Sequence, residues 1–222
     1  MDENVIEVID LSVYACFLRS TEKIVGDVSF CLKRGERLAI VGESGSGKST
    51  LIQHLNALVQ PTSGQVLYNG EDVWAEKYDR KQLRSEVGLV FQYPEYQLFE
   101  ETVYADIAFG PKNMGLSKDE IDARVRRAAG FVGITEKELE KSPFDLSGGQ
   151  KRRAAIAGVI AMEPDVLILD EPTNFVDNRF EKELYNTLRT LNDRMAIVVV
   201  SHDIGTITSV VKEIVCVNRR GH

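Results

Sequence analysis

The chain has 222 residues, of which 43% are hydrophobic, so it is long enough to fold around a sizeable core as one domain. Its 27 basic and 34 acidic side chains give a formal net charge of −7, and no block of lysine and arginine marks a nucleic-acid surface, so we expect no nucleic-acid partner. The three cysteines, Cys16, Cys31 and Cys216, are widely spaced and form no CxxC pair, which predicts neither a disulfide framework nor a structural zinc site.

The amino-terminal stretch, to about residue 68, has segments rich in valine, isoleucine and tyrosine that are separated by Gly26, Gly35 and Gly64. This pattern is typical of antiparallel strands. Within it, Arg37–Val41 is a short apolar run that ends at a glycine-rich turn, and residues 49–58 then begin a helical pattern. The expected local order is therefore strand, loop and helix.

Residues 42–50 match the P-loop pattern G-x-x-x-x-G-K-[ST] in the strand, loop and helix context that the pattern requires. Glycines let the backbone N–H groups of such a loop turn toward phosphate oxygens, and the following helix adds the positive end of its dipole. We predict that Lys48 reaches the β- and γ-phosphates of a nucleotide and that the Ser49 hydroxyl binds Mg²⁺. A flexible loop that only caps a helix is the alternative. The predicted phosphate-binding residues are Gly42, Glu43, Ser44, Gly45, Ser46, Gly47, Lys48, Ser49 and Thr50.

Between about residues 94 and 161 the sequence becomes polar and rich in alanine, arginine and glutamate, with helical spacing of apolar positions in stretches such as 118–129. We interpret this region as a helical insert. Within it, Leu-Ser-Gly-Gly-Gln at residues 146–150 precedes an alanine-rich helix. Ser147, the two glycines and the start of that helix offer hydrogen-bond donors to a phosphate, and a plain helix cap is the alternative.

A second apolar run, residues 166–169, ends in Asp170 and Glu171. Both carboxylates should lie at the carboxyl end of a strand, where open α/β sheets bind their ligands. Because phosphoryl transfer depends on positioning and on neutralising charge, we expect Asp170 to hold Mg²⁺ and Glu171 to orient or deprotonate the attacking water. Taken alone, such an acidic pair more often caps a helix.

A third apolar run, residues 196–200, is followed by His202. Continuous apolar runs of this kind suit strands of a parallel sheet that is covered on both faces. At the end of its strand, His202 could donate a hydrogen bond to the γ-phosphate or to the attacking water, whereas a lone histidine is usually only packed or solvated. His54 and His222 lack such a setting, and we interpret both as structural or incidental.

The pentapeptide at residues 146–150 is the signature of ATP-binding cassette (ABC) proteins, and the order of motifs along the chain resembles that of ABC ATPases. In this resemblance the motifs are Walker A at 42–50, the Q-loop at Gln92, the signature at 146–150, Walker B ending at Asp170 and Glu171, the D-loop near Asp177 and the switch at His202. The implied fold class is α/β, with a P-loop NTPase (RecA-like) core on a parallel sheet, an antiparallel β subdomain and a helical ABC-signature subdomain. Residues 1–222 would form a single ABC ATPase domain. Its ATP-binding core would comprise 1–93 and 162–222, and its helical subdomain 94–161.

The resemblance also implies a head-to-tail dimer in which each chain supplies half of each ATP site. The partner-facing residues would be Ser147, Gly148, Gly149 and Gln150 of the signature, together with Asp177. Gln92 would contact Mg²⁺ or the attacking water, giving Ser49, Gln92 and Asp170 as the metal-binding set. Tyr14 or Phe17 would stack on the adenine of ATP.

Residues 88–111 closely resemble the ATPases of energy-coupling factor (ECF) importers for vitamins, cobalt and nickel. In that subfamily, the segment after the Q-loop shapes a groove for a coupling helix of the membrane protein. Residues 92–99, with the aromatic side chains Tyr93, Tyr96 and Phe99, are the expected docking segment.

From about residue 165 the likeness to ECF ATPases weakens, because Thr-Asn-Phe-Val-Asp at 173–177 departs from the expected ending and the carboxyl-terminal extension typical of these ATPases is absent. Residues 165–222 are more similar to metal-ion ABC importer ATPases. An engineered chimera with a seam near 161–165 is therefore an open alternative.

The expected function is ATP binding and hydrolysis that energise a membrane importer, most simply of the ECF type. No apolar run of about 18 residues or secretory leader is found, so we expect a cytoplasmic protein, peripheral on the inner face of the cell membrane, with other chains spanning the bilayer. It would pair with itself or with a similar ABC ATPase. The alternatives are a soluble ABC ATPase not tied to transport and a non-catalytic interaction module.

Overall fold

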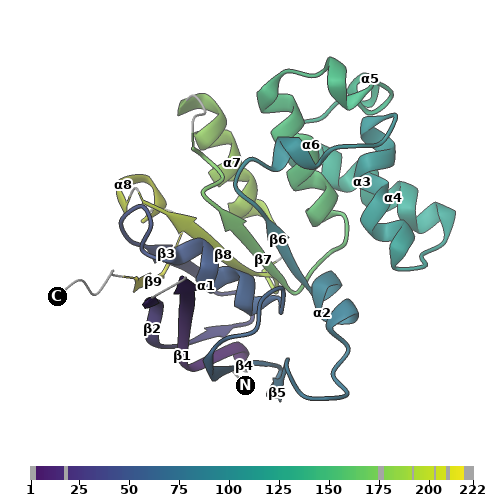
Figure 1. The fold of residues 1–222 in the computed structure, drawn as a ribbon. Helices are drawn as coiled ribbons and strands as arrows, with labels where there is room; N and C mark the ends of the chain where they lie inside the picture. Colours follow the sequence, from purple (N-terminus) through teal and green to yellow (C-terminus); the bar gives the residue numbers. More distant parts are fainter. Residues whose placement is uncertain are drawn as a thin grey trace.

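Two β-sheets and a group of helices make up the described part of the chain, which in this computed structural model comprises residues 4–17, 20–174, 178–191, 193–202, 204–208 and 211–217 (Figure 1). The antiparallel sheet has the order β2-β1-β4-β5 and consists of β1 (Asn4–Phe17), β2 (Ser20–Lys33), β4 (Ser63–Tyr68) and β5 (Glu71–Asp72). The parallel sheet has the order β6-β7-β8-β3-β9 and consists of β3 (Arg37–Val41), β6 (Val87–Val90), β7 (Val166–Asp170), β8 (Ala196–Ser201) and β9 (Glu213–Cys216).

Some helices lie beside the sheets, whereas others form a helical group of their own. The α-helices are α1 (Lys48–Leu55), α2 (Arg80–Glu86), α3 (Val103–Asn113), α4 (Lys118–Phe131), α5 (Glu136–Leu139), α6 (Gly148–Ile160), α7 (Asn178–Thr190) and α8 (Ile204–Ile207), with short 3₁₀ helices η1 (Pro94–Gln97) and η2 (Pro143–Asp145). Figure 1 shows α3, α4, α5 and α6 together at the end of the molecule opposite the antiparallel strands. Among the described residues, no helix is both long and apolar enough to cross a membrane.

Four strands of the parallel sheet, β6, β7, β8 and β3, are buried on both faces, as the apolar runs predicted, whereas the edge strand β9 is mostly exposed. Every residue of β7 and β8 is buried. Because successive side chains of a strand point to opposite faces, Leu167 and Leu169 pack in one core with α3, α4 and α6, whereas Val166 and Ile168 pack in a second core with α1 and the antiparallel strands. The sheet therefore separates two cores and carries polar residues at the carboxyl ends of its strands.

Capping boxes fix the starts of three helices in the helical group. The N-cap residues of α4, α5 and α6 are Ser117, Thr135 and Ser147, respectively. In each helix the side chain of a glutamate or glutamine three residues later accepts a hydrogen bond from the N-cap backbone amide. The region between residues 94 and 161 is thus helical, as its apolar spacing predicted. Its treatment as a separate subdomain remains a proposal.

The helix after the phosphate-binding loop is shorter than its sequence predicted. We expected helical structure over 49–58, but α1 ends at Leu55, with Asn56 as its C-cap and Ala57 in the left-handed region at φ +52°. The apolar pattern continues past this point because Ala57 is buried in the core without being helical.

Candidate active site

The loop between β3 and α1 needs glycine for steric reasons of its own. A Cβ atom at Gly42 would lie 2.1 Å from the Val217 carbonyl oxygen, and one at Gly47 would lie 2.8 Å from the Ile24 carbonyl oxygen. Gly45 and Gly47 also have φ values of +78° and +94°, a conformation that other residues rarely adopt. The loop is therefore held in one shape by close contacts with the surrounding backbone.

Lys48 starts α1 and points back into this loop. Its side chain is only 4% exposed, and its ammonium group donates hydrogen bonds to the carbonyl oxygens of Gly42 (2.8 Å) and Glu43 (2.9 Å). The same nitrogen lies 3.9 Å from Glu171 Oε1. The loop thus fixes a buried positive charge beside the carboxylates that end β7, where a polyphosphate would need it.

Asp170 ends β7 and lies against the first turn of α1. The residue is 4% exposed, the Ser49 hydroxyl lies beside its carboxylate, and its Oδ1 atom has no hydrogen-bond partner within the described part of the chain. Burial raises the pKa of this carboxyl, while the Ser49 hydroxyl and the charge of Lys48 oppose the shift. A hydroxyl beside a buried, unpartnered carboxylate oxygen is a set of hard oxygen ligands that fits Mg²⁺ or its bound water.

Glu171 collects contacts from four other residues at the same edge of the sheet. Its backbone has φ +46°, and its amide donates to the Val200 carbonyl oxygen at 3.0 Å. Gln92 donates from Nε2 to Glu171 Oε2 at 3.4 Å, and Asn174 donates from Nδ2 to the same oxygen. His202, whose side chain is 55% exposed, has its Nδ1 atom 3.8 Å from Glu171 Oε1. The predicted residues Lys48, Gln92 and His202 therefore converge on the Glu171 carboxylate.

Asn174 is a contact of this site that the sequence did not predict. The turn that brings it back is local, since its backbone amide donates to the Glu171 carbonyl oxygen at 3.2 Å. An asparagine three residues after an acid is a common turn former, and this spacing was the available signal.

The signature forms its own structure in the helical group, away from α1 (Figure 1). Ser147 caps α6, its hydroxyl accepts from the Gln150 amide, and Gln150 Oε1 accepts from the Ser147 amide at 2.9 Å. Gly148 and Gly149 are exposed, and a Cβ atom at either would meet no described atom within 4 Å. Nothing in the described chain requires these two glycines.

Two other predicted contacts with ATP, that of an aromatic residue with the adenine and that of Asp177, remain predictions. Tyr14 lies on β1 with 40% of its surface exposed, and the Lys23 ammonium lies 5.7 Å from its ring centre. The side chain of Phe17 and the whole of Asp177 lie outside the described residues.

Comparisons with known proteins point to the same family as the sequence motifs do. A model of the ABC transporter family matches residues 25–174. The chain is 50% identical over 195 residues to the energy-coupling factor transporter ATP-binding protein EcfA2 of Caldanaerobacter subterraneus, a match that covers 87% of this chain and 68% of that protein. The EcfA2 protein of Bacillus subtilis is 45% identical over 197 residues, covering 87% and 71%. Matches of this extent run well past residue 165, so one relative accounts for both sides of the seam considered above.

Solved structures confirm the predicted fold class. The cbiO1 protein of Clostridium perfringens, described as part of the ABC transporter complex cbiONQ, superposes with a TM-score of 0.85 at 36% identity, covering 97% of this chain and 85% of that one. The ATP-binding cassette MJ0796, in a dimeric post-hydrolysis state with ADP and phosphate, gives a TM-score of 0.85 at 25% identity and covers 97% of both chains. The chain belongs to the ABC transporter family and is an ABC ATPase.

Proposed function

We propose that this chain is the ATP-binding and ATP-hydrolysing subunit that energises an ECF importer for vitamins or transition-metal ions. The observation that carries the proposal is the convergence of Lys48, Gln92 and His202 on the Glu171 carboxylate, next to Asp170 and Ser49. The EcfA2 names of its relatives support the importer class.

Binding of ATP would use the phosphate-binding loop at 42–50. The loop amides and the start of α1 would surround the phosphates, and Lys48 would exchange its carbonyl partners for phosphate oxygens. Ser49 and Asp170, with Gln92 beside them, would hold Mg²⁺, which neutralises charge on the phosphates when it is bound. Tyr14 or Phe17 would stack on the adenine.

Hydrolysis would depend on Glu171. Its side chain is 14% exposed, so one edge of the carboxylate remains open to a water molecule while Gln92 and Asn174 hold Oε2. In this geometry Glu171 would orient or deprotonate the attacking water, and His202 would donate toward the γ-phosphate or that water.

Completion of the site would come from a second ABC ATPase, either another copy of this chain or a similar protein. The exposed glycines at 148 and 149 leave room beside the capped start of α6 for a phosphate held by a partner. Signature residues Ser147 and Gln150, with Asp177, would therefore act across the dimer. The dimeric state of MJ0796 supports this arrangement.

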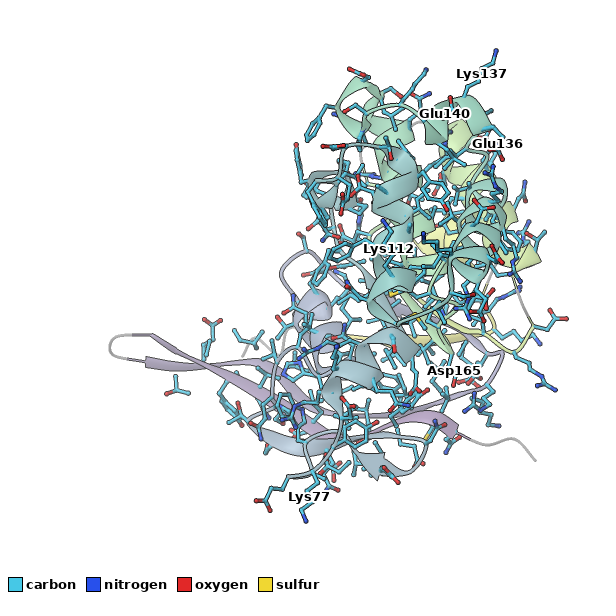
Figure 2. All side chains as sticks on the ribbon, turned by 90° about the vertical axis from the view of Figure 1, so that its right-hand side faces the viewer. Lys77, Lys112, Glu136, Lys137, Glu140 and Asp165 are labelled. Carbon is cyan, nitrogen blue, oxygen red and sulfur yellow. The ribbon has the colours of Figure 1, made fainter. Side chains whose placement is uncertain are left out.

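Association with a membrane subunit would use the surface that includes residues 92–99. Tyr96 and Phe99 are 84% and 59% exposed, and Phe99 packs edge-on against Phe109, which is also exposed. Beside them lies a cavity of about 890 Å³ between α2, α3 and α6. Figure 2 labels Asp165, one of its lining residues, where the helical group meets the sheets. An apolar helix of a transmembrane partner would fit this groove and hold the chain at the cytoplasmic face.

The direct test is the steady-state ATPase activity of the purified chain with and without Mg²⁺, compared with Glu171→Gln. We expect Glu171→Gln to bind ATP normally, to lose hydrolysis by about a hundredfold or more, and to accumulate as a closed dimer with ATP. Equal hydrolysis by variant and parent would remove Glu171 from its assigned role. A parent chain with no Mg²⁺-dependent hydrolysis would favour the non-catalytic module.

Capture of partners from membranes of the source cells, followed by mass spectrometry, separates an importer motor from a soluble ATPase. We expect an integral membrane protein to be recovered with the parent chain and to be lost with Tyr96→Ala and Phe99→Ala together. Recovery of soluble proteins alone would favour the ATPase that is not tied to transport.

A further inference from the structure

Arg152 on α6 has a buried guanidinium whose donors are shared between two distant segments. Its side chain is 5% exposed and forms a paired contact with Glu95 of η1, from Nε to Oε2 at 3.1 Å and from Nη2 to Oε1 at 3.0 Å. The Glu95 side chain is itself only 17% exposed. This fork-to-fork geometry restricts both position and angle, because the guanidinium is planar.

The remaining nitrogen of the guanidinium faces the segment that follows β7. Arg152 Nη1 donates to the Asn174 carbonyl oxygen at 2.7 Å and lies 3.4 Å from that of Pro172. Asn174 in turn donates from its side chain to Glu171 Oε2. Arg152 therefore holds the backbone of Asn174, and the side chain of Asn174 holds the candidate catalytic carboxylate of Glu171.

These hydrogen bonds, together with the backbone that joins Gln92 to Glu95, form a closed circuit. Gln92 donates to Glu171 Oε2, and Glu95 lies three residues further along the same segment. Hydrogen bonds link Gln92 to Glu171, Glu171 to Asn174, Asn174 to Arg152, and Arg152 to Glu95. The backbone then returns from Glu95 to Gln92 through Tyr93, which has φ +59°. The three parts that it joins are the proposed docking segment, the segment after β7 and the signature helix.

We propose that Arg152 is a positioning residue for Glu171, and that Glu95 transmits displacement of residues 92–99 to Glu171 through the Arg152 guanidinium and Asn174. The inference rests on the proposed function, because it assigns Glu171 to hydrolysis. An arginine cannot lose its charge and is costly to leave unpaired when it is buried, so the guanidinium follows Glu95 when that residue moves. Such a movement withdraws Nη1 from the Asn174 carbonyl and releases the second contact on Glu171 Oε2.

The neighbouring residue Arg153 forms an ordinary structural ion pair from the same helix. It lies 3.9 Å from Glu183 of α7, its side chain is 26% exposed, and the contact joins two helices without reaching Glu171. Arg126 of α4 is more exposed still and pairs with Asp122 and Glu136. Arg126→Gln is therefore a matched control that removes an arginine ion pair remote from the site.

The test compares Glu95→Gln, Arg152→Lys, Asn174→Ala and Arg126→Gln by kcat, KM and thermal unfolding of the whole chain. We expect the first three to lower kcat by about tenfold with little change in KM, because they misplace a carboxylate without touching the phosphate-binding loop. Arg126→Gln should leave kcat unchanged. Combining Glu95→Gln with Asn174→Ala should lower kcat no further than the larger single effect, since both act through one route.

A charge swap, Glu95→Arg with Arg152→Glu, separates positioning from stability. The swap restores an ion pair, but the glutamate at 152 cannot donate to the carbonyl oxygens of Asn174 and Pro172. We expect thermal unfolding to recover toward that of the parent while kcat stays about tenfold low. Recovery of both quantities would overturn the proposal and leave a structural ion pair.

Hydrogen exchange of the nucleotide-free chain decides the proposal independently of hydrolysis. We expect Glu95→Gln to accelerate exchange of the backbone amides of Glu171, Thr173 and Asn174, and Arg126→Gln to leave it unchanged. Unchanged exchange in Glu95→Gln, or unaltered kcat in folded Asn174→Ala, would overturn the relay. A parent chain that shows no hydrolysis would instead contradict the proposed function, while the exchange result would still stand.

Discussion

The phosphate-binding loop and the signature are both glycine-containing segments that lead into a helix, yet Gly42 and Gly47 of the first have different surroundings from Gly148 and Gly149 of the second. At Gly42 and Gly47 the chain's own backbone lies too close for a side chain, and Gly47 has a left-handed φ. At Gly148 and Gly149 there is open space and no such φ. The first segment needs glycine at 42 and 47 in order to fold, whereas no described part of the chain requires glycine at 148 or 149. This contrast supports the proposal that the signature is completed from outside the chain.

Gly42→Ala should have the largest effect, because its Cβ atom would lie 2.1 Å from the Val217 carbonyl oxygen. The β3 to α1 connection must then move. We expect about 2–3 kcal/mol of lost stability and ATP binding weakened by about a hundredfold. Calorimetric unfolding and titration with a fluorescent ATP analogue measure the two quantities. Normal binding by Gly42→Ala would contradict the requirement for glycine in this loop.

Gly149→Ala should separate stability from hydrolysis. Alanine in the first turn of α6 meets no described atom and favours the helix by up to about 1 kcal/mol, so unfolding should occur at or slightly above the parent temperature. ATP should bind the isolated chain normally. Hydrolysis should fall by about tenfold, because the methyl group occupies the space that a partner's phosphate would approach.

The control for Gly149→Ala is Gly130→Ala, which adds the same methyl group in open space on α4. It should stabilise the chain in a similar way without altering hydrolysis. If both variants hydrolyse ATP at the parent rate, the open glycines of the signature have no role in a trans contact.

Ser147→Ala should have a smaller effect on both quantities. It removes the first cap of α6 and should cost about 1 kcal/mol of unfolding free energy. Ser117→Ala removes the equivalent cap of α4, so it should cost a similar amount. We expect only Ser147→Ala to slow hydrolysis at a temperature where both are folded. Equal rates in the two variants would reduce Ser147 to a helix cap, the alternative that the sequence left open.

Sequence patterns predicted the sheet better than they predicted the site's internal contacts. The strand Arg37–Val41 was predicted with its observed bounds, because a short apolar run that ends at a glycine has the length and the flank of a buried strand. The helix prediction over 49–58 was wrong at its end, since Ala57 is apolar and buried but left-handed. Apolar pattern reports burial, and burial does not fix backbone conformation.

Arg152 and Asn174 show a second limit on what the sequence reveals. Arg152 stands beside Lys151 and Arg153 in a run of three basic residues, and the sequence does not distinguish the one that is buried against Glu95, 57 residues away. Asn174 offers only a turn-forming residue type at a suitable spacing. Local spacing located the phosphate-binding loop, whereas contacts between distant segments required the folded arrangement.

The smallest expected effect is on the pH dependence of stability, and it comes from Asp170, beside the phosphate-binding loop. Burial raises the pKa of Asp170 above its ordinary 3.8, so the folded chain holds this proton more tightly than the unfolded chain. The associated stability is present at pH values below about 4 and is lost as the pH rises through the raised pKa. Asp170→Asn should therefore match the parent at low pH and become more stable than it as the pH rises. Urea unfolding at a series of pH values measures the difference.

Asp122→Asn gives the opposite sign and serves as the control, because a hydrogen bond from Arg126 lowers the pKa of Asp122. That stability is present above the unfolded pKa and is lost as the pH falls, so Asp122→Asn should be the less stable chain near neutral pH and should match the parent in acid. Addition of Mg²⁺ with ATP should narrow the gap between Asp170→Asn and the parent, because the cation offsets the buried charge. Ser147 and Gln150 of the signature do not titrate in this range, so Gly149→Ala should follow the parent's pH profile. A pH-dependent difference in Gly149→Ala would mean that the two halves of the site interact within one chain.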